Sequence, residues 1–202
     1  MDQKTAELKT LFNERFGIDC GIDEAGRGSW AGPVVAAAVV LPKNFYLESL
    51  DDSKKLSKKN REIIFNQLKG TSKIGVGYAS SNEIDQYNIL QATFLAMKRA
   101  INALADLPDR ALIDGNVIPP KFPCPAEAIV KGDSRVASIA AASVIAKVIR
   151  DRLMKNLAKT YPGYGWETNF GYGVKAHSDA LKTIGLTPEH RRSFRPIHNI
   201  LC

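Results

Sequence analysis

The sequence predicts an α/β fold: a mixed β-sheet flanked by helices, with a small helical part at the C-terminal end. Strand-like segments with short connections come first, and such consecutive strands favour antiparallel neighbours. Further strand-like segments follow a long amphipathic helix, and strands separated by helices favour parallel additions. The 202 residues are enough for one domain, which we divide into a core over residues 1–160 and a segment over 161–202 packed on it.

The first predicted elements are a helix, two strands and the turn between them. Residues 3–16 have helical spacing, and residues 17–23 alternate between apolar and polar side chains as a strand does. Gly26-Arg27-Gly28 is a glycine-rich turn signal. The apolar run over residues 32–41 is short and rich in valine, which favours a buried strand over a helix.

The middle of the chain carries two predicted helices around a third strand. Residues 42–60 are predicted as a loop, at whose end Ser57 can cap a helix that runs to residue 68. Residues 73–79 form the third strand. Ser81 or Asn82 begins a long amphipathic helix, whose apolar face comprises Ile84, Tyr87, Ile89, Leu90, Phe94, Met97, Ala100, Ile101 and Leu104.

The C-terminal half adds two strands and the helices that follow them. Residues 110–114 and 127–130 are predicted as short strands. Asp133 or Ser134 begins a second long helix that runs to about residue 160. The rest of the chain comprises a loop rich in Gly, Tyr and Pro over residues 161–173, a short helix over 175–184 and a basic tail.

The composition excludes several classes of protein. Hydrophobic residues make up 45% and charged residues 24%, as in ordinary globular proteins. Cys20, Cys124 and Cys202 are too far apart for a disulfide framework or a zinc motif. The N-terminus has no signal-peptide pattern, and the longest apolar stretch is far below the roughly 20 residues that span a bilayer. We therefore expect a cytoplasmic protein without a membrane partner.

The positive charge is concentrated in the C-terminal part of the chain. The formal net charge is +7, and residues 121–202 carry all of it, with 13 basic and six acidic residues. Such a basic surface serves solubility or binds a polyanion, and nucleic acid is the favoured candidate.

Four acidic residues stand at predicted strand ends or beside a glycine: Asp23, Glu24, Asp114 and Asp133. Open sheets place ligands at strand ends along one edge. Clustered carboxylates repel one another unless a cation lies between them, and carboxylates with water suit Mg²⁺ or Mn²⁺ rather than Zn²⁺. Two such ions about 4 Å apart serve phosphoryl transfer. The alternatives are a helix cap for Asp133, a plain turn at Asp114-Gly115 and loop charges for the other two.

Other groups also have two interpretations. The amides and the arginine of the 26–28 turn could contact a phosphate or form only a turn, and the basic stretch over residues 54–59 could bind phosphate or form a solvated face. The aromatic residues of the 161–173 loop could stack on sugars or bases, or anchor that loop on the core. The three histidines lack ligand spacing and are predicted to be structural: His177, His190 and His198.

Several stretches resemble ribonuclease HII and follow the order in which that family carries them. They begin with GIDEAGRGSWAGPVVAAAVVL at 21–41 and DDSKKLSKKNRE at 51–62. LIDGN at 112–116 and KGDSRVASIAAASVIAKVIRD at 131–151 follow, and the last are YPGYG at 161–165, GYGVKAH at 171–177 and HRRSF at 190–194. The similarity covers almost the entire chain.

This resemblance implies a ribonuclease H-like mixed sheet with helices and a small C-terminal helical part. It implies an endoribonuclease of DNA replication and repair that hydrolyses the RNA strand of RNA–DNA hybrids. The same family incises duplex DNA 5′ of single embedded ribonucleotides and leaves 3′-hydroxyl and 5′-phosphate ends by two-metal-ion catalysis. The matching catalytic and metal-binding residues are Asp23, Glu24, Asp114 and Asp133, with two Mg²⁺ or Mn²⁺ ions. We expect a monomer.

The resemblance also implies which residues bind the substrate. Gly26, Arg27 and Gly28 match the Gly-Arg-Gly motif that contacts the ribose 2′-hydroxyl and the phosphate at the RNA–DNA junction. Tyr172 matches the junction-sensing tyrosine, and the 2′-hydroxyl is the group that separates RNA from DNA. Substrate contacts are further implied for Lys54, Lys55, Ser57 and Arg191.

The chain departs from the family pattern at three places, none of which touches the four acids. Ser29-Trp30 replace Pro-Leu, Asn169-Phe170 stand where Lys is common, and Val174 replaces Thr. With 22 residues before Asp23, we expect no extra N-terminal domain of the ribonuclease HIII type. Two other interpretations stay open: another two-metal enzyme, such as a nuclease of DNA junctions, and a non-catalytic protein that binds hybrids.

Overall fold

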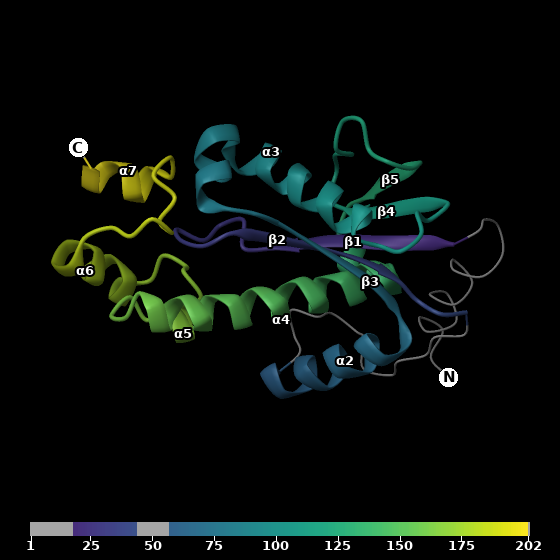
Figure 1. Ribbon diagram of the computed structural model, residues 1–202, viewed down its shortest axis with the longest axis horizontal. Helices are drawn as coiled ribbons and strands as arrows, with labels where there is room; N and C mark the ends of the chain where they lie inside the picture. The colour runs from purple at the N-terminus through teal and green to yellow at the C-terminus, as the bar shows by residue number, and fades with distance from the viewer. Residues whose placement is uncertain (1–17, 44–56, 202) are drawn as a thin grey trace.

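The computed structural model describes residues 18–43 and 57–201, and its centre is a five-stranded mixed sheet (Figure 1). The strands follow the spatial order β3-β2-β1-β4-β5. The antiparallel pairs are β1 with β2 and β2 with β3, and the parallel pairs are β1 with β4 and β4 with β5, which confirms the predicted mixed sheet. The strands are β1 (Asp19–Ala25), β2 (Val34–Val40), β3 (Lys73–Ala79), β4 (Arg110–Asp114) and β5 (Ala126–Ile129).

Helices cover both faces of this sheet (Figure 1). One face is covered by α3, the other by α4 with α2 outside it, and the shorter helices α5, α6 and α7 gather at one end of α4. The bounds are α2 (Lys58–Thr71), α3 (Ser81–Asn102), α4 (Ala137–Thr160), α5 (Trp166–Asn169), α6 (Lys175–Ile184) and α7 (Arg195–Leu201). None of the helices described is long and apolar enough to cross a membrane.

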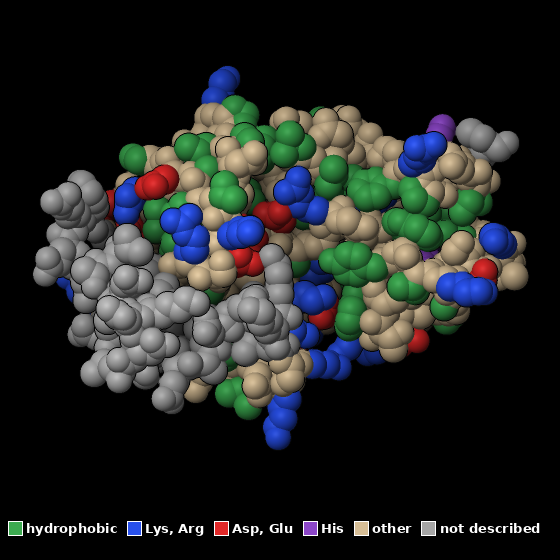
Figure 2. All heavy atoms as spheres, turned by 180° about the vertical axis from the view of Figure 1, so that it is seen from behind, with side chains coloured by type: hydrophobic (Ala, Val, Ile, Leu, Met, Phe, Trp, Pro, Cys, Tyr) green, Lys and Arg blue, Asp and Glu red, His purple; other side chains and the backbone are tan. Residues whose placement is uncertain are grey.

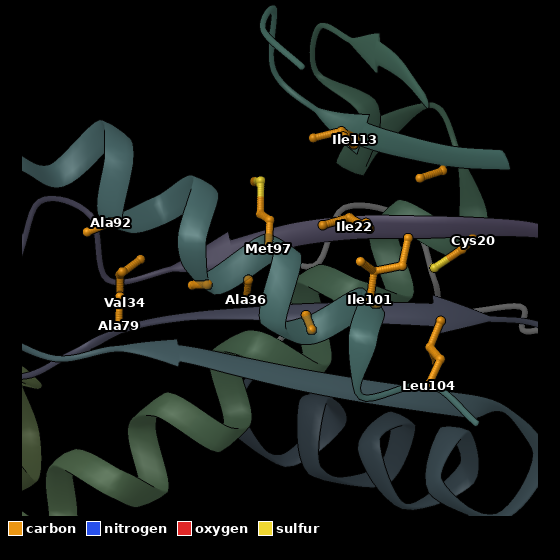
Figure 3. Close-up of a cluster of buried hydrophobic side chains, with 14 of the residues drawn as sticks. Cys20, Ile22, Val34, Ala36, Ala79, Ala92, Met97, Ile101, Leu104 and Ile113 are labelled. Atoms are coloured by element: carbon orange, nitrogen blue, oxygen red, sulfur yellow. The ribbon is translucent and has the colours of Figure 1, made fainter. Parts of the chain in front are cut away.

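Close packing of these helices fixes the positions of the strand ends. Figure 3 shows Ile22 of β1 facing Met97 and Ile101 of α3 in a cluster of fully or almost fully buried side chains. On the other face, a Cβ atom added to Gly21 of β1 would collide with the backbone of Ser138 in α4. The absence of a side chain at Gly21 therefore lets the first turn of α4 lie directly on β1.

The start of α3 agrees with the sequence, but its apolar face does not. Ser80 and Glu83 form a capping box ahead of a helix that begins at Ser81. The predicted buried residues Tyr87 and Leu90 are 45% and 40% exposed. The reason is a kink at Asn88, whose φ of 67° interrupts the helical turn and shifts the register of the face.

The beginning of α4 also differs from the prediction. Asp133 does not cap this helix, because it lies in a separate single 3₁₀ turn over Gly132–Ser134, and α4 begins only at Ala137. The cap predicted for α2 is confirmed: the Ser57 hydroxyl accepts a hydrogen bond from the Asn60 N–H at 3.2 Å. The helix predicted over residues 3–16 lies outside the described residues.

The C-terminal segment packs against the core through a third apolar cluster. Its buried members come from the β1–β2 connection, α4, the segment over 161–184 and α7: Ala31, Met154, Tyr164, Trp166, Ala180, Leu181 and Ile197. Tyr164 and Trp166 are buried, so these aromatic residues anchor their loop on the core rather than stack on a ligand. That loop also contains the short helix α5, which the sequence did not predict.

Candidate active site

The end of β1 opens into a cleft of about 380 Å³. Three of the four predicted acids line it, together with the 26–28 loop, by which we mean Gly26, Arg27 and Gly28. The full lining comprises Asp23, Glu24, Ala25, Gly26, Arg27, Gly28, Arg61, Asp114, Ser143, Lys147 and Tyr172. Lys and Arg side chains (blue) are spread over the face seen in Figure 2, with acids (red) among them.

Strand register brings two of these acids together. Because Ile22 of β1 lies opposite Ile113 of the parallel strand β4, the next residues, Asp23 and Asp114, emerge at the same edge. Asp23 Oδ1 accepts the N–H of Glu24 at 2.7 Å, which fixes its carboxylate at the strand end.

Asp23 is a buried acid with two other acids beside it. This side chain is 4% exposed, and burial raises the pKa of its carboxyl well above the usual range, with the charges of Glu24 and Asp114 adding to the shift. Glu24 is partly neutralised, since its Oε1 lies 3.1 Å from the guanidinium of Arg27. The cleft therefore brings three carboxylates together with the three basic side chains of Arg27, Arg61 and Lys147.

The fourth acid, Asp133, lies beside this cleft. It is 6% exposed and is not part of the lining described above. Its neighbour Gly132 donates its N–H to Asp114 Oδ1 at 2.7 Å, so the turn that carries Asp133 is tied to the cleft.

The donor set suits a hard divalent cation. No three His, Cys, Asp or Glu side chains within 18–43 and 57–201 converge closely enough to hold an ion as they stand. The lining nevertheless supplies three carboxylates and no sulfur or imidazole, and a cation would relieve the repulsion that raises the pKa of Asp23. Oxygen donors of this kind fit Mg²⁺ or Mn²⁺.

The two glycines of the 26–28 loop serve different purposes. Gly26 has a φ of 96°, and an added Cβ atom would collide with the guanidinium of Arg150, so packing requires glycine there. A Cβ atom added to Gly28 would meet nothing within 4 Å. The loop is thus tightly held at Gly26 and open at Gly28.

Arg191 corrects the sequence interpretation. It was predicted to contact substrate, but it is 0% exposed and lies behind the 26–28 loop. Its guanidinium donates only to backbone carbonyl oxygens: those of Gly32, Arg27 and Gly26, at 2.9, 2.8 and 2.7 Å. A basic residue of a charged tail was expected at the surface, and the sequence contains no signal that separates this buried arginine from its exposed neighbour Arg192.

Tyr172 lies where the sequence predicted a substrate-facing residue. It lines the cleft, is 37% exposed, and its ring centroid lies 5.8 Å from Lys147 Nζ. Three further polar lining residues were not predicted from the sequence: Arg61, Ser143 and Lys147. The spacing of Ser143 and Lys147, one helical turn apart, could have placed both on one face of α4.

The remaining predicted contacts are distributed differently. Lys54 and Lys55 lie outside the described residues, and Ser57 is engaged as the cap of α2. The departures from the family pattern range from buried to exposed, and Val174 is 44% exposed. Ser29 is fully buried, Asn169 binds the Gly171 N–H and the Tyr164 carbonyl, and Val174 stands at the N-cap of α6 without a capping hydrogen bond.

Comparisons with known proteins agree with this geometry. Residues 20–197 match the family model described as ribonuclease HII. A ribonuclease HII of Paramagnetospirillum magneticum is 58% identical over 90% of this chain and 92% of the relative. Another from Jannaschia sp. is 55% identical over 94% of this chain and 95% of the relative. The crystal structure of ribonuclease H2 from Pyrococcus horikoshii superposes with a TM-score of 0.75 at 27% identity, covering 90% of this chain and 96% of that one.

These matches extend over both the core and the C-terminal segment, and they include the cleft at the end of β1. The chain therefore belongs to the ribonuclease HII family of metal-dependent endonucleases, which cleave RNA in RNA–DNA hybrids.

Proposed function

We propose that this protein hydrolyses the RNA strand of hybrids and also incises duplex DNA 5′ of a single embedded ribonucleotide. The products would carry 3′-hydroxyl and 5′-phosphate ends. The observation that supports this proposal is the joint lining of one cleft by Asp23, Glu24 and Asp114 with the 26–28 loop and Tyr172. We expect the protein to act as a cytoplasmic monomer.

The acids would hold two Mg²⁺ or Mn²⁺ ions, with Asp133 completing the set from its adjoining turn. When bound, these ions supply activation of water and charge stabilisation for the departing oxygen. Ser143 supports this arrangement, since its side chain hydrogen-bonds Asp23.

Other lining residues would position the substrate. The open face at Gly28 lets a sugar and its phosphate approach the backbone, because a side chain there would cover it. Lys147 and Arg61 would bind neighbouring phosphates, which gives affinity without reading bases. The Tyr172 ring would pack on the ribose at the RNA–DNA junction.

The direct test uses a labelled DNA duplex that contains one ribonucleotide, incubated with Mg²⁺, Mn²⁺ or EDTA beside an all-DNA duplex. We expect metal-dependent incision 5′ of the ribonucleotide and an intact control. Cutting of the all-DNA duplex would instead identify a DNA nuclease, and binding without cutting in either metal would identify a non-catalytic protein.

A variant of Tyr172 tests the junction assignment. Tyr172→Ala should reduce cleavage at a single ribonucleotide more than cleavage of a continuous hybrid, because only the former depends on one junction. The ratio of kcat/KM for the two substrates measures this preference. An equal loss on both substrates would show that Tyr172 does not sense the junction.

A further inference from the structure

Two arginines lie wholly inside the molecule, directly behind the 26–28 loop. Arg150 of α4 is 1% exposed and Arg191 is 0% exposed. Charged side chains are almost never fully buried unless an opposite charge accompanies them, because removing a cation from water is costly. The partners of these two guanidinium groups therefore decide what their charge does.

Every hydrogen bond of this pair goes to the backbone. Those of Arg191 go to three carbonyl oxygens of the 26–32 segment, as described above. Arg150 likewise donates to three carbonyl oxygens: those of Pro33, Phe170 and Ala31, at 3.0, 2.9 and 3.1 Å. Carbonyl groups satisfy the N–H donors but carry no net charge, so they leave the two positive charges in place.

The acids that act on the pair from further away are Asp151 and Asp85, and both are engaged elsewhere. Asp151 holds the ammonium group of Lys147 at 2.7 Å. Asp85 accepts three hydrogen bonds from the 192–193 segment. Within the described part of the chain, no carboxylate contacts either guanidinium.

Burial of the two charges lowers the pKa of Arg191. Burial lowers the pKa of its guanidinium to about 9, and the charge of Arg150 is the second cause. Both groups are still protonated at neutral pH. Two like charges, buried together and without a contacting carboxylate among the described residues, make a positive contribution to the local potential, opposite in sign to that of the cleft carboxylates.

That potential lies under the one open stretch of backbone in the loop. Arg150 packs against Gly26, Arg191 binds the Gly26 and Arg27 carbonyls, and Gly28 has free space in front of it. The Arg150 Cζ atom is also 5.6 Å from the centroid of the Tyr172 ring. The pair therefore stands behind both elements to which substrate contacts are attributed.

We propose that Arg150 and Arg191 form a buried cation pair whose unpaired charge draws a backbone phosphate of nucleic acid onto the 26–28 loop without touching it. Both arginines are then positioning residues that act through the loop. The phosphodiester supplies a negative charge that no contacting carboxylate supplies within residues 18–43 and 57–201. This inference rests on the proposed function, because it assumes that the loop receives nucleic acid.

The test separates charge from shape. Arg191→Gln keeps N–H donors but removes the charge, and Arg191→Lys keeps the charge but loses the planar fork. Lys73→Gln is the matched control, since it removes one positive charge at the start of β3, the opposite end of the sheet. Binding of a duplex with one ribonucleotide is measured by fluorescence anisotropy in EDTA, from about 50 to about 250 mM KCl.

We expect Arg191→Gln to weaken binding about tenfold at the lowest salt and to flatten the plot of log affinity against log salt by about one unit. Arg191→Lys should keep the slope of the wild type, and Lys73→Gln should change neither quantity. Equal losses for the Gln and Lys variants with an unchanged slope, in proteins that retain their circular dichroism, would overturn the proposal.

If Arg191→Gln does not fold, the wild-type protein provides the test. Inorganic phosphate at constant ionic strength should shift the Gly28 amide resonance, and no shift at about 50 mM phosphate would overturn the proposal. The proposed function is judged separately by metal-dependent cleavage. If the wild type cleaves but Arg191→Gln keeps the wild-type affinity and salt slope, only the cation pair is refuted. If the binding data show the predicted slopes but the wild type does not cleave, only the proposed function is refuted.

Discussion

The cleft at the end of β1 and the buried polar cluster behind it differ in their electrostatics: the cleft gathers carboxylates, and the cluster gathers N–H donors. The cleft brings Asp23, Glu24 and Asp114 together, and burial and like charge raise the pKa of Asp23. The buried polar cluster, which consists of Arg150, Arg191, Trp166, His177 and His190, makes its hydrogen bonds to acceptors of the chain itself.

The two histidines show how complete this satisfaction is. His190 Nδ1 accepts the Thr187 N–H at 2.9 Å, so its proton sits on Nε2 and points at His177 Nε2, 3.0 Å away. His177 Nε2 also accepts from Trp166 Nε1, which leaves the His177 Nδ1 proton to bind the Tyr172 carbonyl at 3.0 Å. Both rings are neutral and have one possible tautomer each. Hydrogen-bonded polar groups fix the position of Tyr172, whereas the three carboxylates that line the cleft are oxygen donors that suit a cation.

The largest expected effect comes from removing a charge from the cleft. Asp23→Asn should lower cleavage by at least about a thousandfold, because a metal ligand is lost, while the fold is retained. The rate of hybrid cleavage in Mg²⁺ measures this loss. Asp19→Asn, on the same strand at the opposite end of the sheet, is the matched control and should keep the wild-type rate within about twofold. A rate for Asp23→Asn within tenfold of the wild type would contradict the assignment.

The same variant should be more stable than the wild type in the absence of metal. The pKa of the Asp23 carboxyl is higher in the folded state than in the unfolded state. The fold therefore loses stability as the pH rises from the unfolded-state pKa through the folded-state pKa. The unfolding midpoint of Asp23→Asn in EDTA should therefore exceed that of the wild type at pH 8, and the difference should vanish towards pH 4. A lower unfolding midpoint for Asp23→Asn than for the wild type at pH 8 would show that the charge of Asp23 does not destabilise the fold.

A pair of glycine variants compares the held and the open part of the 26–28 loop. Gly26→Ala should destabilise the fold by roughly 2–4 kcal/mol, because the new methyl group meets Arg150 at a φ of 96°. Gly28→Ala should cost less than about 1 kcal/mol but raise KM for a ribonucleotide-containing duplex. Urea unfolding and steady-state kinetics of both variants measure these effects. Equal destabilisation by the two variants would contradict the claim that Gly26 is tightly packed and Gly28 is open.

Low pH should destabilise the fold by protonating the histidines of the buried polar cluster. Burial and the neighbouring His177 lower the pKa of His190 to about 4 from its usual value of 6.5. The unfolded chain then binds more protons between pH 6.5 and 4, so stability is complete above pH 6.5 and is lost as the pH falls towards 4. The loss amounts to roughly 3 kcal/mol. In His190→Asn, the unfolding free energy should depend less on pH across this window than in the wild type. An unchanged pH dependence would contradict the claim that His177 and His190 are buried as neutral rings.

The smallest expected effect concerns α6. Val174 stands at its N-cap in an extended conformation without a side-chain hydrogen bond, so Val174→Thr should add a cap worth about 1 kcal/mol. Thermal unfolding measures the gain, and Val174→Ala serves as the control without a hydroxyl. Cleavage should stay within about threefold, and a larger change would give this position a substrate contact.

The sequence predicted the sheet and most helices because periodicity and caps are local properties, as at Ser57 and over Lys73–Ala79. The four acids stood out because they follow apolar strands. Arg191 was assigned to the substrate by the resemblance and by its place in a basic tail, and neither reveals burial, which is why Arg191 was misplaced. The kink at Asn88 depends on its side chain accepting the N–H groups of Leu90 and Gln91, which no apolar pattern encodes.

The central claim is that the cleft needs a divalent cation, whereas the cluster behind it makes its hydrogen bonds within the chain and needs no metal. The most direct measurement is the unfolding midpoint with and without MnCl₂ for the wild type, Asp114→Asn and Asp19→Asn. At about a hundred times the dissociation constant, Mn²⁺ should stabilise the wild type and Asp19→Asn by about 2.7 kcal/mol, or roughly 5–10 °C, and Asp114→Asn hardly at all. An unchanged wild-type midpoint, or an equal rise in Asp114→Asn, would contradict the claim.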